Sequence, residues 1–347
     1  MTENKKKFSA FHVARLPEWE IAAREELQGA NPWEKLAYHR DDLTILPYYD
    51  QKRDNSSTRL LPYIENSSRG PRTWYNCPSI LVQDPIKANE RALFCLHQGA
   101  EGLYFVLEQN PDFNLLLANI DWPWCSLNFL VKNNPASVAR NLHQFILKKK
   151  YTSMLHGAFF GNINPAIQFP FRFAGIQFRA DPSPVKEITD GFEALRYMLK
   201  NDFSAPQFAF SVSIGNDFFT ELAKLRAIRL LWSRILETEK IKAVPLFIHA
   251  HVMPWTDPRF QPHGNMLKST TAAIASILGG CDVLTVESED SGNTTMERAA
   301  QNVSNILREE SYLSKVADPV AGSSFIEELT GQLSTSVWNN LQRNNKA

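Results

Sequence analysis

The chain has 347 residues, and its 37 lysines and arginines balance 37 aspartates and glutamates. Without net charge it has no overall field that would attract nucleic acid or an anionic membrane, so neither partner is expected. The four cysteines lie far apart without a Cys-x-x-Cys pair, which argues against a zinc site or a disulfide framework and favours a reducing compartment. The basic first residues precede no apolar stretch, and no later segment approaches the roughly 20 apolar residues of a membrane span, so we expect a cytoplasmic protein.

Residues 1–80 differ in composition from the rest and are expected to form an extended amino-terminal arm. They are punctuated by proline, interrupted by a polar run at 50–58, and contain an amphipathic segment at 18–28. The large aromatic residues of this arm are Trp19, Trp33, Tyr48, Tyr49 and Tyr63. An arm cannot bury these side chains by itself, so we expect it to wrap around a partner chain rather than only the main domain.

Residues 81–347 are expected to form one domain. From residue 102 onward, short β-rich runs alternate with segments of helical period, a pattern typical of a parallel sheet built from βα units. The predicted strands are 102–107, 126–131, 155–160, 173–179, 208–214, 245–251, 283–287 and, more weakly, 315–317. The predicted helices are 135–149, 185–200, 217–237, 263–278 and 294–310. Eight strands predict an α/β fold, a parallel (βα)8 barrel of the TIM type.

In such a barrel the active site lies at the carboxyl ends of the strands. The polar residues at the predicted ends are Asn133, Asn134, Asn162, Arg179, Asp181, Asn216, Asp217, His249, His251, Glu287 and Glu289. They contain no obvious set of acid, base and nucleophile. His249 and His251 share one side of a strand, as in some zinc hydrolases, but further ligands are not visible, so no metal site is assigned and hydrogen-bonded histidines are favoured.

Three parts of the chain, in matching order, resemble the barrel domain of the methylmalonyl-CoA mutase family. The first is Trp19 to Tyr48, which resembles the arm with which family members embrace a partner. The second is Ala205-Pro206 followed by the run from Ser213 to Ala227 and by Leu231-Trp232. The third comprises Asn265 to Lys268, Gly279-Gly280, Glu309 to Ser311 and Val316 to Pro319.

The resemblance implies a reaction and a cofactor for the family. Its catalytic members rearrange the carbon skeleton of an acyl-CoA through radicals, which arise from adenosylcobalamin held on a carboxyl-terminal domain with an Asp-x-His-x-x-Gly loop. No such loop occurs in this sequence. We therefore expect no cofactor on this chain and adenosylcobalamin on a partner subunit.

Several positions that carry catalytic residues in the family have changed. The family's Arg-Gln-Tyr run after a tryptophan corresponds here to the residues around Tyr75, which follows Trp74. The histidine that ends the fourth strand falls near Arg179. The arginine of the family's Ala-Pro-Arg is replaced by Gln207, a neutral amide that cannot offset an anion.

The family's His-x-Gln-x-x-Gly-Trp motif survives only in part. His249 and Trp255 match, whereas His251 stands at the glutamine position. His249 is thus the only matched active-site residue, and we assign no catalytic residue. Bulky residues at 103–107, 127–131, 159–160, 208–210 and 246–248 also predict a filled barrel interior where active members thread the CoA arm.

These observations favour a small, non-catalytic subunit that stabilises a catalytic large subunit in a heterodimer, with a self-dimer in its absence. One alternative is an active acyl-CoA mutase module that a separate cobalamin-binding protein completes in trans. A weaker alternative is a metal-dependent barrel hydrolase using His249 and His251.

Overall fold

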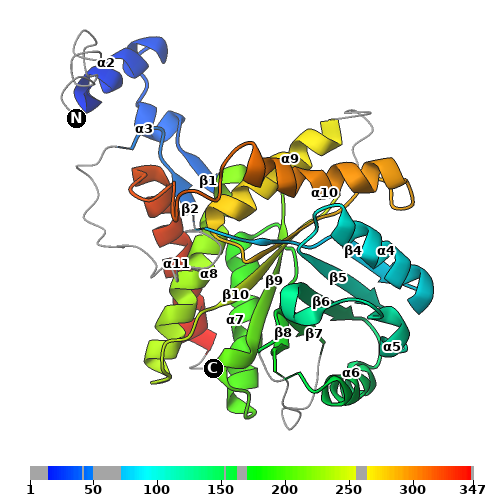
Figure 1. The fold of residues 1–347 in the computed structure, drawn as a ribbon. Coiled ribbons are helices and arrows are strands. Elements are labelled where there is room, and N and C mark those ends of the chain that lie inside the picture. Colours follow the sequence, from blue (N-terminus) through cyan, green and yellow to red (C-terminus); the bar gives the residue numbers. More distant parts are fainter. Residues whose placement is uncertain are drawn as a thin grey trace, which may run out of the picture.

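The computed structural model describes residues 15–40, 43–49, 72–151, 154–161, 170–254 and 264–344. In this part of the chain, nine strands form a parallel sheet that helices surround on its outer face (Figure 1). Its strands are β3 (Tyr75–Asn76), β4 (Ser79–Val82), β5 (Gly102–Leu107), β6 (Ser126–Val131), β7 (Gly157–Phe160), β8 (Arg172–Phe178), β9 (Phe208–Ile214), β10 (Phe247–Val252) and β11 (Val283–Val286).

The two edges of the sheet meet in one short segment of chain. β3 pairs with β11, and β4, which follows after Cys77 and Pro78, pairs with β5. The backbone N–H of Cys77 donates to Leu284 O at 3.0 Å, and that of Tyr104 donates to Pro78 O at 2.9 Å. β3 and β4 are therefore two halves of one barrel strand, and the sheet curls into an α/β barrel of the TIM type, which confirms the predicted fold class.

The helices that cover the barrel follow the strands in chain order. They are α4 (Pro85–His97), α5 (Phe113–Leu116), α6 (Pro135–Lys149), α7 (Pro184–Lys200), α8 (Phe218–Thr238), α9 (Gly264–Gly279), α10 (Thr294–Glu309) and α11 (Ser324–Asn344), with 3-10 turns η2 (Trp122–Trp124) and η3 (Ala205–Gln207). Most buried apolar side chains lie between these helices and the sheet. Several helix starts are capped by side chains: Asp84, Asn293 and Asp217 each accept a backbone N–H of the first turn.

The predicted strand at 315–317 is wrong, and the first barrel strand was missed. Residues 315–317 lie in the irregular connection between α10 and α11, where Ala317 O accepts from Arg72 and the neighbouring Asp318 pairs with Arg226. The missed strand consists of β3 and β4 with Pro78 between them. Proline has no N–H for a sheet ladder, so it interrupts the sequence pattern that is typical of a strand. β3 lies before residue 80, where the arm was expected to end.

Two buried ion networks fasten α8 to its neighbours. Lys224 Nζ lies 3.1 Å from both carboxylate oxygens of Glu187 on α7, 2.7 Å from Glu221 Oε2, and donates to Ser213 O at 2.9 Å. Desolvation, opposed by Lys224, raises the pKa of Glu187 to about 7. One buried ammonium therefore pairs with two carboxylates, of which that of Glu187 is buried and that of Glu221 is partly exposed.

The second network joins α8 to the carboxyl-terminal part of the chain. Arg226 is 2% exposed, and it pairs with Asp318 and, at 2.8 Å, with Glu327 at the start of α11. These contacts hold α11 along α8 on the outside of the barrel (Figure 1).

The described arm residues form helices α2 (Leu16–Glu26) and α3 (Pro32–Lys35) and the hairpin β1 (Tyr38–Arg40) with β2 (Leu43–Ile45). Figure 1 shows α2 and α3 standing away from the barrel, beyond this hairpin. Trp19 packs on Trp33 and Tyr48, with ring centroids 5.1 and 5.0 Å apart. The arm thus covers part of its aromatic surface with its own residues. Tyr63 and Trp255 lie outside the described residues.

The root of the arm is fixed to the barrel. Thr44 N donates to Gln332 Oε1 at 2.9 Å, and Gln332 Nε2 donates back to Thr44 O at 3.0 Å. Arg40 forms a 3.0 Å ion pair with Asp217, the cap of α8, and Leu43 is buried. Among the described helices, none combines the length and apolar character needed to cross a membrane.

Candidate functional site: the barrel interior

A second, smaller cluster of side chains fills the inside of the barrel. Its buried members are Cys77, Tyr104, Ala158, Phe160, Ala209, Phe247 and Val283, with Tyr75, Val106 and Leu130 partly buried against it. They occupy alternate positions along the strands, because successive side chains of a strand point to opposite faces. The interior is a packed core and not a lined channel at these positions.

Three rings from three strands meet across the barrel axis. Tyr104 on β5 lies 4.5 Å from the ring of His249 on β10 and 6.5 Å from that of Phe160 on β7, measured between centroids. Phe160 and His249 are 5.8 Å apart. Each ring is at most 1% exposed. We call these three residues the ring triangle, and it closes the axis toward the carboxyl ends of the strands.

Both ring nitrogens of His249 are committed to neighbouring strands. Thr285 Oγ1 donates its proton to Cys77 O at 2.6 Å, so it accepts from His249 Nε2–H at 2.9 Å. His249 Nδ1 then accepts from the Ser211 hydroxyl at 3.1 Å. Burial, with His251 nearby, lowers the pKa of His249 well below its usual range. His249 is a neutral, fully bonded core histidine, so it has no free nitrogen for a substrate or a metal.

His251 lies one layer nearer the carboxyl end and is paired with an acid. Its Nε2 is 2.6 Å from Glu287 Oε1, and its ring stacks on His249 at 5.7 Å. The side chains of His251 and Glu287 are 16% and 25% exposed, so this pair reaches solvent at the mouth of the barrel. A histidine hydrogen-bonded to a carboxylate is an arrangement that can accept or donate a proton.

The interior also contains polar atoms without partners among the described residues. They include the Tyr104 hydroxyl, Asn128 Oδ1 and Arg172 Nε. The Tyr104 hydroxyl lies near Ser211 without a hydrogen bond to it, and burial raises the pKa of Tyr104 strongly. Because buried polar groups are usually bonded, such atoms mark places where water or a ligand belongs.

The structure spreads the other residues singled out in the sequence over both ends of the barrel. Arg179 follows β8 at the carboxyl end and is exposed. Gln207 closes the turn before β9 at the amino end, where its side chain accepts from Ser204 N at 2.7 Å. Tyr75 begins β3, also at the amino end, with its ring 5.6 Å from His156. Only His249 and His251 lie together, and His249 is inside its strand rather than at its end.

Sequence reasoning missed Tyr104, Phe160, Ser211 and Thr285 as neighbours of His249. The only sequence signal was the alternation within each strand, which gives the face of a residue but not its partner across the barrel. No group of three or more histidine, cysteine, aspartate or glutamate side chains able to hold a metal gathers among the described residues.

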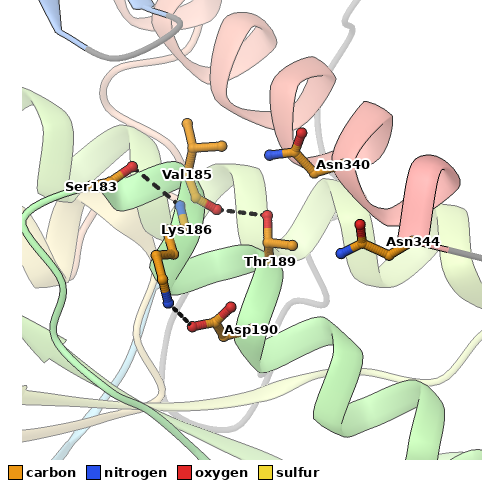
Figure 2. A pocket seen from close by; sticks show the side chains of 7 residues that line it. All are labelled: Ser183, Val185, Lys186, Thr189, Asp190, Asn340 and Asn344. Atoms are coloured by element: carbon orange, nitrogen blue, oxygen red, sulfur yellow. Dashed lines mark hydrogen bonds and ion pairs between the residues drawn. The ribbon is translucent and has the colours of Figure 1, made fainter. Parts of the chain in front are cut away.

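A hollow of about 500 Å³ lies on the outside of the barrel, between α7 and α11 (Figure 2). Its lining residues are Ser183, Val185, Lys186, Thr189, Asp190, Asn340 and Asn344. Figure 2 shows Lys186 turned toward Asp190, with which it pairs. Ser183 caps α7. The charge of Lys186 is therefore already neutralised by Asp190, and the hollow has no connection with the ring triangle.

Comparison with known proteins finds similarity to one family. Residues 189–347 match the family model for methylmalonyl-CoA mutase. The chain is 26% identical to the methylmalonyl-CoA mutase small subunit of Porphyromonas gingivalis, over 97% of this chain and 63% of that protein. It is 35% identical to the small subunit of Streptomyces virginiae, over 44% of this chain and 26% of that protein.

The chain thus spans less than two thirds of the length of the relatives it matches. Similarity to solved structures is weak, with a TM-score of 0.37 and 13% identity to Yersinia pestis DHPS over 78% of this chain and 98% of that one. The family match covers α8 and the Arg226 network but begins just after Glu187, and the small-subunit match extends over nearly the whole chain. Together these comparisons support a member of the methylmalonyl-CoA mutase family.

Proposed function

We propose that this chain is a small, non-catalytic subunit that pairs with a catalytic mutase subunit and stabilises it. The partner isomerises methylmalonyl-CoA and succinyl-CoA and carries adenosylcobalamin. The observation that carries this proposal is the ring triangle, because a CoA arm threaded along the axis would have to pass where Tyr104, Phe160 and His249 are in mutual contact. The names of the small-subunit relatives support the same role.

Electrostatics inside the barrel support a non-catalytic role. His249, the one residue that matches the family's active site, is neutral and has both nitrogens bonded. Gln207 replaces an arginine, which removes a cation that would meet an anionic substrate. A radical reaction on an acyl-CoA needs a bound thioester, and His249 and Gln207 do not provide a binding site for one.

The arm supplies the surface for the partner. Its root is held by Thr44, Arg40 and Leu43, whereas its outer part keeps large apolar side chains in solvent. Ile21 is 62% exposed, and Leu36 is 46% exposed. An anchored root with an apolar outer part is suited to wrap a second chain, because burying those side chains there removes apolar surface from water.

Co-purification with a cobalamin-bearing large mutase subunit tests this role. We expect a heterodimer in size-exclusion chromatography, and Ile21→Glu should weaken it at least tenfold, about 1.4 kcal/mol. Leu147→Glu is the matched control, because Leu147 on α6 is equally exposed at 62%. A chain that stays monomeric beside the large subunit, or equal effects of the two variants, would count against the proposal.

One observation favours a second function, an acyl-CoA mutase module completed in trans by a cobalamin-binding protein. His251 and Glu287 form a solvent-reaching pair at the carboxyl end of the barrel, where barrel enzymes place their catalytic groups. Mutase activity of the chain with only a cobalamin-carrying protein, abolished by Glu287→Gln, would establish this function in place of the first.

A further inference from the structure

The amino-terminal half of the barrel interior contains a cation that the mutase chemistry does not use. Arg172 begins β8, and its guanidinium carbon lies 4.5 Å from the centroid of Phe247, a member of the interior cluster. A bulge in β8 explains why the side chain of Arg172 points into the barrel. Ala158 pairs with Arg172 and Phe160 pairs with Gly175, so β8 contains one more residue than β7 between the two pairs. The extra residue turns Arg172 onto the inner face.

This guanidinium has no ion pair or hydrogen bond among the described residues, and its Nε is buried. The nearest acid to influence it is Asp282, but that carboxylate already accepts from Ile248 N at 2.7 Å and from Arg229 at 2.8 Å. Two arginines therefore face one aspartate. Arginine is rarely buried without a partner, because desolvation penalises its charge.

A second unpartnered atom lies in the row of paired strand residues that contains Arg172. Asn128 pairs with Ala158, and Ala158 pairs with Arg172, so the three residues form one row across β6, β7 and β8. The middle residue has only a methyl group, and Asn128 Oδ1 has no partner in the described structure. Asn128 also pairs with Tyr104, so the row runs from Arg172 to one member of the ring triangle.

We propose that the amino-terminal half of the barrel interior binds a small oxyanion, of the size of phosphate or a carboxylate, through Arg172. The ion enters from the amino-terminal mouth, since the ring triangle closes the other side. A planar guanidinium binds such an ion with two parallel hydrogen bonds. The same chemistry could be offered by free phosphate or by the phosphate end of coenzyme A, and we commit to the free ion because the ring triangle blocks the axis along which the rest of coenzyme A would lie.

Thermal unfolding in phosphate and in chloride of equal ionic strength tests this site. Phosphate should raise the melting temperature of the full chain more than chloride does. Arg172→Gln should weaken phosphate binding at least about tenfold, as expected for loss of a charge-assisted pair. Arg179→Gln is the control, because this exposed arginine lies at the opposite end of β8 and should leave the phosphate effect unchanged.

Broadening of the phosphorus NMR signal of phosphate by the unmodified chain gives a readout that needs no variant, and Arg172→Lys, which keeps a cation, should retain part of it. The proposal is overturned by a phosphate effect no larger than that of chloride, or by an equal effect in Arg172→Gln. Binding of coenzyme A without binding of inorganic phosphate would also overturn it. None of these outcomes depends on whether the chain pairs with a mutase subunit.

Discussion

The outside and the inside of the barrel treat buried polar groups differently. Outside the sheet, Lys224 and Arg226 on α8 are each at most 2% exposed, and each lies between two carboxylates. Inside, Arg172 has no ion pair among the described residues, and Tyr104 and Asn128 each leave an atom without a hydrogen bond. The outer layer also has such atoms, Arg226 Nε among them, but there the charge of the side chain is paired. Paired charges in the outer layer hold helices in place, whereas unsatisfied atoms add nothing to stability. The difference teaches that paired charges in the outer layer fasten the helices of this chain, whereas the interior keeps polar groups that a ligand or water can meet.

Removing the cation of the first network should have the largest effect. Lys224→Met leaves Glu187 and Glu221 buried around an apolar side chain, and we expect a loss of about 3–5 kcal/mol in the free energy of unfolding. Urea denaturation followed by circular dichroism measures it. The control is Lys132→Met, whose exposed pair with Glu108 should change stability by less than about 1 kcal/mol. Similar losses in the two variants would remove the distinction between inside and outside charges.

The same network predicts a pH dependence. Because the pKa of Glu187 is raised from 4.5 to about 7, the folded chain keeps a proton that the unfolded chain releases between these values. The contribution of Glu187 to the free energy of unfolding is fully present below pH 4.5 and falls by about 3 kcal/mol as the pH rises to 7. Glu187→Gln should lack this fall. The difference in unfolding free energy between the parent and this variant, measured from pH 4.5 to 7, checks it, and a flat difference would refute it.

The smallest effect is expected in the interior. Tyr104→Phe removes a buried hydroxyl that has no hydrogen-bond partner while keeping the ring in the triangle. We expect the variant to be as stable as the parent or more stable, by at most about 1 kcal/mol. Thermal unfolding measures this change. A clear destabilisation would mean that the hydroxyl is bonded, and the interior would then resemble the outer layer.

Much of the fold could be predicted from the sequence, because strand alternation and helical period are local. β5, β6 and β9 begin and end at the predicted residues, and α6 does as well. The strand that closes the barrel could not be predicted, since Pro78 interrupts it and its two halves pair with different neighbours. The turn at 315–317 depends on Arg226, which contacts Asp318 from 92 residues away in sequence.

From the sequence it could be predicted that large side chains fill the interior, but not which of them are in contact. Bulky strand residues indicated a filled axis, yet the meeting of Tyr104, Phe160 and His249 depends on the registers of three strands far apart in sequence. The inward direction of Arg172 was hidden for the same reason, because a bulge shifts the alternation by one residue. Long-range register has no local sequence signal.

The central claim is that the ring triangle closes this barrel to a thioester. Isothermal titration of the isolated chain with methylmalonyl-CoA tests it most directly, with the large subunit as the positive control. We predict no binding to the isolated chain at micromolar concentrations. Micromolar affinity that falls on substitution of His251 or Phe160 would show that the axis admits substrate, and would contradict the account.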